Sequence, residues 1–230
     1  MAPTTLQAAA TYLRARGWFA DQPASLQQLI LRSAKLLNIA AGKTVYRQGD
    51  SPSGLFGICS GRLKFSYTHR SGKEIIAGFG SSGQWFGEVS MIDALPRHNT
   101  VTAVSSTTLV QIPQKQFDEI VTKEPKVVRN FSTLLCSNFR FNSFFHDDVL
   151  MQPPLIRLAN LLSLLVQVDF KQGHKKDIVL EISQGQLASM IGLSRQTTNR
   201  LLQHLKEKNL IELQYGAIIV LDVPGLSKTS

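Results

Sequence analysis

The C-terminal third of the chain contains polar side chains whose types and spacing suit the reading of DNA bases. They lie in the stretch ISQGQLASMIGLSRQTTNRLLQHLKEKNLI, residues 182–211. An arginine can donate a fork of hydrogen bonds to guanine, and glutamine or asparagine can both donate to and accept from adenine. A helix over the second half of this stretch would turn five such residues outward: Arg195, Gln196, Asn199, Arg200 and Gln203.

Two short helices joined by a tight turn are needed to position these side chains. Ser183 followed by Gln186 is a capping-box arrangement, which predicts a helix start at Gln184. Gly192 can supply the left-handed backbone that ends such a helix, and Ser194 can cap the next one. Helices joined by so tight a turn cross at a large angle, so this stretch is predicted to form a helix-turn-helix.

The predicted second helix separates an apolar face from the polar one. Thr198, Leu201, Leu202 and Leu205 share the face that would pack inward. Hydroxyl residues near the helix starts can reach phosphates, which the positive end of a helix also attracts. The alternative is a helical hairpin with a solvated polar face. The expected DNA-contacting residues are Ser183, Ser194, Arg195, Gln196, Thr197, Asn199, Arg200 and Gln203.

The overall composition agrees with an anionic partner. The 25 Lys and Arg residues exceed the 16 Asp and Glu residues, giving a formal charge of +9, which favours nucleic acid first and an acidic membrane second. Polar residues interrupt the longest apolar stretch, 155–170, so we expect no membrane or export segment. A cytoplasmic location is therefore expected. Cys59 and Cys136 have no metal-ligand spacing and are expected to be buried free thiols. No catalytic constellation is recognisable, so we do not expect an enzyme.

The N-terminal half combines a helical start with a β-rich module. Leu26, Leu29, Ile30, Ala34 and Leu37 form a helical stripe after Pro23, and short runs separated by Gly, Ser, Asp and Pro follow from 41 to 113. That rhythm predicts an antiparallel sandwich or barrel. A long helix is expected after Pro125, with a stripe at Val128, Phe131, Leu135, Asn138, Asn142, Phe145 and Val149.

Such a narrow stripe suits a coiled coil with a second copy of the chain, so we expect a homodimer through residues 125–150. The alternative is a helix that lies on its own β module. The prolines of MQPP, 151–154, end the helix and mark a boundary. A helix from Leu155 to about Val168 follows, then a short strand, the helix-turn-helix, and a hairpin that turns near Gly216 and would act as a wing on the DNA backbone.

Three segments in a fixed order then show a family resemblance. They are GKTVYRQGDSPSGLFGICSGRLKFSY, GQWFGEVSMIDALPRHNTVTA and SRQTTNRLLQHLKEKNLI. Together they resemble the cyclic-AMP receptor and fumarate-nitrate regulator (CRP/FNR) family of bacterial transcription regulators. The resemblance implies an α+β fold with an N-terminal β-roll of the cyclic-nucleotide-binding type (a double-stranded β-helix), a long dimerisation helix and a C-terminal winged helix-turn-helix. The expected divisions are 1–124, 125–151 and 152–230.

The resemblance also implies an effector pocket for cyclic AMP or cyclic GMP. Gly87 would offer a backbone N–H, Glu88 would accept from the ribose hydroxyl, and Arg97 would pair with the phosphate. The alternative is that Glu88 and Arg97 form a plain surface ion pair. Asn142 and Ser143 fall where the base would be met, although Asn142 could instead fix coiled-coil register.

This sequence departs from the family pattern directly after Arg97. Nucleotide-binding members usually have a small hydroxyl residue and then alanine there, whereas this chain has His98 and Asn99. His98 is therefore counted as a pocket residue in place of the hydroxyl. A non-nucleotide effector and effector-independent DNA binding remain alternatives, and so does a nucleotide-binding module that contacts protein. No metal, iron–sulfur cluster or haem is expected, because no cysteine precedes Cys59 and the histidines are isolated.

The resemblance finally implies how DNA is read. Gln196 stands where family members commonly have glutamate, which predicts a preference shifted from cytosine toward adenine at one base pair. A dimer would meet two half-sites of a palindrome on double-stranded DNA, about one helical turn apart. RNA polymerase is an expected further partner, and no membrane partner is expected.

Overall fold

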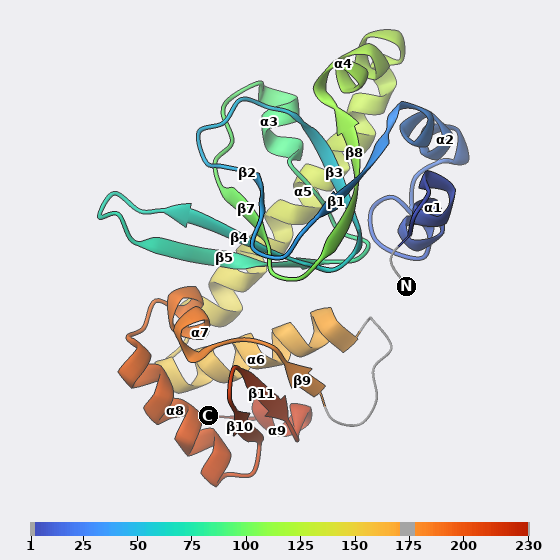
Figure 1. Cartoon of the computed structure of the whole chain (residues 1–230). Coiled ribbons are helices and arrows are strands. Elements are labelled where there is room, and N and C mark those ends of the chain that lie inside the picture. Colours follow the sequence, from blue (N-terminus) through green and yellow to red (C-terminus); the bar gives the residue numbers. More distant parts are fainter. Residues whose placement is uncertain (1–2, 171–177, 230) are drawn as a thin grey trace. The chain divides into compact units, whose positions relative to one another are not determined.

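The computed structural model describes residues 3–170 and 178–229, which form two compact units, 1–139 and 140–230. The division falls inside the long helix predicted for dimerisation. Figure 1 shows a β-rich first unit and a mainly helical second unit. The first unit contains α1 (Leu6–Arg14), α2 (Ala24–Ser33), β1 (Lys35–Ile39), β2 (Thr44–Tyr46), β3 (Gly54–Ser60), β4 (Arg62–Thr68), β5 (Glu74–Ser81), β6 (Trp85–Phe86), α3 (Glu88–Asp93), β7 (Thr100–Ala103), β8 (Thr107–Pro113), α4 (Gln114–Lys123) and most of α5 (Val128–Phe145).

Two antiparallel four-stranded sheets make up the predicted β module. Their strand orders are β1-β8-β3-β6 and β2-β7-β4-β5. The module begins at Lys35 rather than 41, because the helix predicted to continue to Leu37 ends at Ser33. Ala34 already has an extended backbone, and Leu37 lies in β1 opposite Leu109.

The strand β3 has apolar residues on both faces because both faces are covered. Leu55 and Cys59 point toward a cluster shared with the helices, whereas Phe56 and Ile58 point into the space between the sheets. Successive side chains of a strand lie on opposite faces. This double coverage explains why GLFGICS is almost continuously buried.

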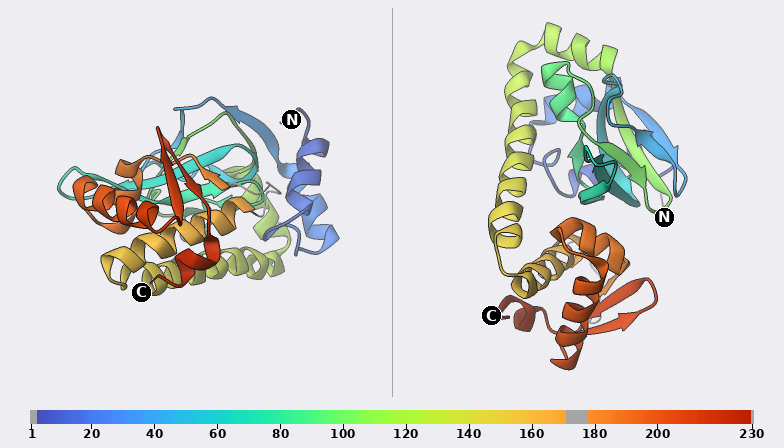
Figure 2. Two further views of the ribbon diagram at one scale, coloured as in Figure 1. Left: turned by 90° about the horizontal axis from the view of Figure 1, so that it is seen from below. Right: turned by 90° about the vertical axis from the view of Figure 1, so that its left-hand side faces the viewer.

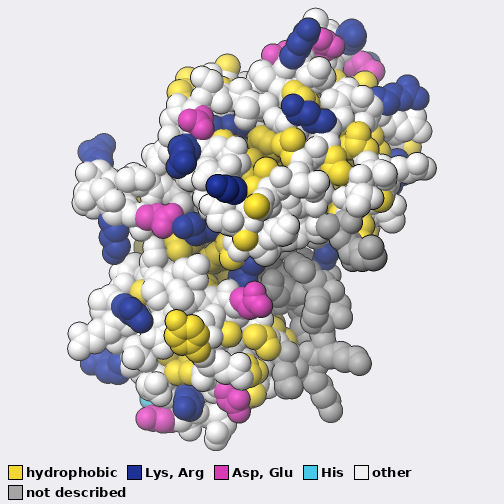
Figure 3. Space-filling view, in the orientation of Figure 1, with side chains coloured by type: hydrophobic (Ala, Val, Ile, Leu, Met, Phe, Trp, Pro, Cys, Tyr) yellow, Lys and Arg dark blue, Asp and Glu magenta, His cyan; other side chains and the backbone are white. Residues whose placement is uncertain are grey.

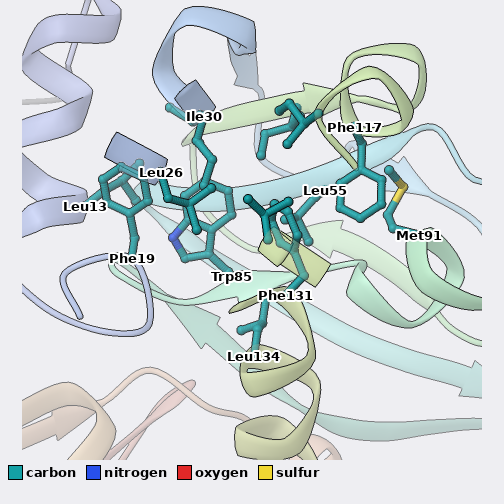
Figure 4. Packing of buried hydrophobic residues seen from close by; sticks show 14 of the residues in the cluster. Leu13, Phe19, Leu26, Ile30, Leu55, Trp85, Met91, Phe117, Phe131 and Leu134 are labelled. Carbon is teal, nitrogen blue, oxygen red and sulfur yellow. The ribbon is translucent and has the colours of Figure 1, made fainter. Parts of the chain in front are cut away.

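Aromatic rings join the helices to the β module. Trp85 stacks on Phe19 with ring centroids 5.5 Å apart, and it meets the edge of Trp18 at 5.5 Å. Figure 4 shows Trp85, Phe19 and Phe131 among the buried residues of this cluster. Trp18 Nε1 donates to the carbonyl oxygen of Asn130 on α5 at 2.9 Å. The right-hand view of Figure 2 shows α5 following α4 along the β module.

The second unit has the elements predicted for a winged helix-turn-helix. The chain leaves α5 through one wide helical turn, His146–Leu150, and the predicted break at MQPP is followed by α6 (Pro154–Phe170). A three-stranded antiparallel sheet of order β10-β11-β9 lies with the helices. Its elements are β9 (Ile178–Leu180), α7 (Gln184–Ile191), α8 (Arg195–Glu207), β10 (Ile211–Gln214), β11 (Ala217–Val220) and α9 (Val223–Ser227).

The two cysteines differ in environment, and the expectation that both are buried is wrong for one of them. Cys59 is fully buried in β3, whereas Cys136 is exposed on α5. Burial raises the pKa of the Cys59 thiol to about 12. Because only the thiolate is strongly nucleophilic, Cys59 is inert at neutral pH.

Candidate nucleic-acid interface and effector site

The turn between α7 and α8 has the predicted capping. Ser183 Oγ accepts from Gln186 N at 3.2 Å, and Gln186 Oε1 accepts from Ser183 N at 2.8 Å, which completes the capping box. Gly192 ends α7 with a left-handed backbone, φ 66°. Ser194 then caps α8 by accepting from Thr197 N at 3.0 Å. The helix-turn-helix therefore forms from local signals that the sequence already contains.

The helix α8 has one buried face and one exposed polar face. Thr198, Leu202 and Leu205 are fully buried, and Leu201 is half-buried. Thr198 Oγ1 also donates to the carbonyl oxygen of Ser194 at 3.0 Å, so this polar residue is satisfied inside the unit. Thr197 is half-buried, and the other predicted DNA-contacting residues are exposed: Ser183, Ser194, Arg195, Gln196, Asn199, Arg200 and Gln203.

The wing is the hairpin of β10 and β11, which turns at Tyr215 and Gly216 as expected. Tyr215 is fully exposed at the tip, a feature that the sequence pattern did not single out. Figure 3 shows Lys and Arg side chains spread over the visible faces of both units. The positive charge is thus not confined to the helix-turn-helix.

A second group of polar residues gathers at the start of α3. Glu88 is 6% exposed, and its Oε1 accepts from Asn138 Nδ2 of α5 at 2.9 Å. Gly87 precedes it with φ 92°, and a Cβ there would lie 2.9 Å from Arg97 Nη1. The positive φ favours glycine here, and any side chain would also have to displace the end of Arg97. The structure therefore brings Gly87, Glu88 and Arg97 together, as the family resemblance implied.

Arg97 lies in the interior of the first unit and is not part of a surface ion pair. Only 2% of the residue is exposed. Its Nη1 donates to the carbonyl oxygen of Gly87 at 2.8 Å, and its Nη2 donates to that of Gly54 at 2.6 Å. Among the described residues, Arg97 Nε has no hydrogen-bond partner. The Nε donor of the guanidinium therefore remains unused.

Tyr46 and Asn99 complete the surroundings of Arg97. The centroid of the Tyr46 ring is 4.3 Å from Arg97 Cζ, and Tyr46 Oη donates to Asn99 Oδ1 at 3.3 Å. Burial lowers the pKa of Arg97, and the nearby Tyr46 and Glu88 oppose that shift. Burial also raises the pKa of the Tyr46 hydroxyl, so it stays neutral. Neither residue was predicted for the pocket, although Asn99 had been recognised as a departure from the family pattern.

The residue types at this place fit the ribose and phosphate of a cyclic nucleotide. A buried carboxylate and a buried guanidinium with an unused donor lie together, which suits a hydroxyl donor and an anion. Both already have protein partners, which a ligand would have to replace. Of the remaining predicted pocket residues, His98 is exposed beside Arg97 in sequence, whereas Asn142 (exposed) and Ser143 (half-buried) belong to the second unit.

The stripe predicted for the dimer seam is wrong at three positions. Phe131 is 1% exposed within the aromatic cluster, Asn138 donates to Glu88, and Val149, beyond the end of α5, is 1% exposed. The part of α5 that contains Phe131 and Asn138 lies on its own β module, which was the alternative interpretation. The outer side of the helix instead presents Val128, Ser132, Leu135, Phe139 and Asn142, of which Phe139 is 68% exposed.

Comparison with known proteins agrees with both halves of this description. Residues 36–124 match the family model of the cyclic nucleotide-binding domain, and residues 156–229 match that of the Crp-like helix-turn-helix domain. The cyclic AMP receptor protein of Thermus thermophilus is 28% identical over 179 residues, covering 78% of this chain and 80% of that protein. The cAMP-activated global transcriptional regulator CRP of Haemophilus influenzae is 22% identical over 181 residues, covering 78% and 81%.

Solved structures support the same fold. The c-di-GMP-responsive global regulator CLP of Xanthomonas campestris superimposes with a TM-score of 0.73 at 17% identity, covering 87% of this chain and all of that one. A CRP/FNR-family transcriptional regulator of Thermus thermophilus gives a TM-score of 0.70 at 19% identity, covering 84% and 97%.

A β-roll of the cyclic-nucleotide-binding type and a winged helix-turn-helix define a class of DNA-binding transcription regulators. This chain belongs to the CRP/FNR family of that class. The family consists of transcription regulators rather than enzymes. Within the described residues, no helix has the length and apolar character needed to cross a membrane.

Proposed function

We propose that this regulator reads a palindromic operator with the exposed face of α8. The observation that supports the proposal is the division of α8 into a fully buried face and an exposed face of Arg195, Gln196, Asn199 and Arg200. Arg195 and Arg200 would donate to guanine, and Gln196 and Asn199 would pair with adenine. Ser183, Ser194, Thr197 and Gln203 would contact the backbone or flanking bases.

The test is fluorescence anisotropy with an operator selected from random duplexes. Arg200→Ala should weaken binding to the selected site by about 1–3 kcal/mol and relax specificity at one base pair. Arg70→Ala is the matched control, because it removes the same charge from an exposed turn of the first unit outside residues 125–150. Equal losses in the two variants, or no DNA binding by the wild type under any condition, would refute the proposal.

Salt dependence distinguishes DNA reading from a protein-interaction role for the second unit. Each neutralised phosphate releases counterions, so the affinity for DNA should fall steeply as the salt concentration rises. The slope should become shallower when a phosphate-contacting residue is removed. If the second unit served only to bind protein, added DNA would give no binding that weakens steeply with salt.

We propose further that two copies of the chain form a dimer through residues 125–150, on the outer side of α5. Val128, Ser132, Leu135, Phe139 and Asn142 follow one another by steps of four and three, the spacing of a coiled-coil seam. Phe139→Glu should dissociate the dimer in analytical ultracentrifugation, whereas Phe141→Glu, an aromatic change two residues further along, is the matched control. A dimer that survives Phe139→Glu would place the interface elsewhere.

The effector that we propose is a cyclic nucleotide, with cyclic AMP tested first and cyclic GMP second. The relatives named above as cAMP regulators and the fit of Glu88 and Arg97 support this choice. Gly87, His98, Asn142 and Ser143 are the other proposed pocket residues. Calorimetry should show binding that Arg97→Ala abolishes and that Arg47→Ala, at an exposed neighbour of Tyr46, leaves unchanged.

The effector must bind the DNA-competent state better than the other state if it is to regulate anything. Operator affinity with and without nucleotide therefore measures the coupling directly. We propose RNA polymerase as a further partner and the cytoplasm as the site of action, because both follow from regulating transcription in bacteria. Co-purification with polymerase on operator DNA would test the first of these.

A further inference from the structure

Three buried side chains form a connected set in the space between the two sheets of the first unit. Tyr46, Arg97 and Asn99 are exposed by 5%, 2% and 8%. Tyr46 covers one face of the guanidinium at 4.3 Å and donates its hydroxyl hydrogen to Asn99 Oδ1 at 3.3 Å. We call Tyr46, Asn99 and the guanidinium of Arg97 the arginine clasp.

The clasp has a second layer of contacts on the main chain. Arg97 donates to carbonyl oxygens that precede α3 and begin β3, namely those of Gly87 and Gly54. The ring of Phe56 lies 5.8 Å from Arg97 Cζ, and it stacks on Phe86 with centroids 5.2 Å apart. The guanidinium is thus enclosed by aromatic rings and carbonyl oxygens, which are the neighbours that stabilise a buried cation.

The clasp depends on the side chain of Asn99. Its Oδ1 is the acceptor for the Tyr46 hydroxyl, and an alanine at this position could not accept that hydrogen bond. Asn99 therefore fixes the Tyr46 hydroxyl, and with it the ring that covers Arg97.

A phosphate would compete with the clasp for the same guanidinium. A charge-assisted pair with phosphate is stronger than a hydrogen bond to a neutral carbonyl, but the ligand gains only the difference between the contacts formed and those given up. Whatever stabilises the clasp in the empty protein must therefore weaken the binding of a phosphate group.

We propose that Tyr46 and Asn99 set the affinity of the β-roll for a phosphate-bearing ligand, by holding Arg97 in the interior until the ligand replaces their contacts. This inference rests on the cyclic-nucleotide effector of the proposed function. It assigns the two residues as positioning residues, which act through Arg97 and need no contact with the ligand themselves.

The test is isothermal calorimetry of the full chain with cyclic AMP and cyclic GMP. Asn99→Ala and Tyr46→Phe each remove the hydrogen bond between the two residues and keep the rest of the cluster. Each should tighten nucleotide binding about two- to tenfold, the range expected for one net hydrogen bond. The double variant should bind no more tightly than the single ones, because all three lack the same bond.

The matched control is Asn38→Ala in β1. Asn38 also accepts a hydroxyl hydrogen bond, from Thr108 Oγ1 at 3.0 Å, but it lies on an exposed position away from Arg97. Its loss should leave nucleotide affinity unchanged. Urea unfolding of every variant shows that the affinities compared are those of folded protein.

Nucleotide affinities of Asn99→Ala and Tyr46→Phe that equal the wild-type value or fall below it would overturn the inference. So would additive gains in the double variant, or silence of all variants toward both nucleotides. Operator affinity with and without nucleotide is measured on the same samples. Absence of DNA binding under both conditions would refute DNA reading, whereas intact DNA binding with unchanged nucleotide affinity would refute only the clasp.

Discussion

Replacing Arg97 by methionine is expected to destabilise the first unit as well as to remove a phosphate partner. The change keeps a long unbranched side chain and deletes the guanidinium. It leaves the carbonyl oxygens of Gly87 and Gly54 without the donors that now lie at 2.8 and 2.6 Å. It also removes the cation that Tyr46 covers.

The magnitude follows from these contacts. A buried carbonyl left without its donor costs about 1–3 kcal/mol, so two cost about 2–6 kcal/mol. The loss of the cation–π contact adds up to about 2 kcal/mol. Relief from burying a charge acts in the opposite direction and offsets part of the sum. We therefore expect Arg97→Met to lower the free energy of unfolding by about 2–4 kcal/mol.

Urea unfolding monitored by tryptophan fluorescence is the suitable assay. The chain has two tryptophans, Trp18 and Trp85, and both pack in the aromatic cluster of the first unit. Their emission therefore reports the unit that contains Arg97. Arg47→Met is the control, because this exposed arginine lies one residue after Tyr46 and should change stability by no more than about 0.5 kcal/mol. Equal unfolding midpoints for Arg97→Met and the wild type would show that the buried contacts of Arg97 do not stabilise the first unit.

Three further outcomes are expected. Gln196→Glu should move the preferred base at one operator position from adenine toward cytosine. Selection from randomised duplexes measures this preference, and an unchanged preference would contradict the prediction. Cys59 should resist alkylation at pH 8 in the folded protein, because burial raises its pKa to about 12; peptide mapping that finds Cys59 modified before unfolding would contradict this. The hydrogen bond from Lys64 lowers the pKa of Glu74 below its ordinary 4.5. The ion pair therefore stabilises the protein above pH 4.5 and loses its effect as the pH falls further. Glu74→Gln should lower the free energy of unfolding by under about 1 kcal/mol at pH 7, because Glu74 is half exposed, and should leave it unchanged near pH 2. A loss of stability that grows toward low pH would refute this pH dependence.

The helix-turn-helix was predictable from the sequence because its signals are local. Ser183, Gln186, Gly192 and Ser194 act on backbone groups within a few residues of themselves, and the structure shows each of them in the predicted capping role. The break at MQPP and the hairpin turn at Gly216 have the same origin. Proline and glycine restrict or free the backbone wherever they stand, whatever packs around them.

The interpretation of α5 failed where two apolar faces competed. Val128, Phe131, Leu135 and Asn138 were assigned to one seam, because three- and four-residue steps describe both a stripe that pairs with another helix and one that packs on a sheet. The rest of the first unit decided between them by burying Phe131 beside Phe117 of α4, with ring centroids 4.8 Å apart, and by placing Glu88 of α3 opposite Asn138. Both partners lie outside α5.

The sequence by itself therefore determined the kinds of elements, their order, and the outward polar face of α8, since these depend on caps, turn residues and periodicity. The family resemblance added which residues could hold an effector. Only the tertiary structure decided that Arg97 is enclosed by Tyr46, Gly54 and Gly87, and that Asn99 fixes Tyr46 from 53 residues away. The partners of this buried charge come from β2, from β3 and from the residue that precedes α3, and their choice depends on how the two sheets meet, which no local pattern encodes.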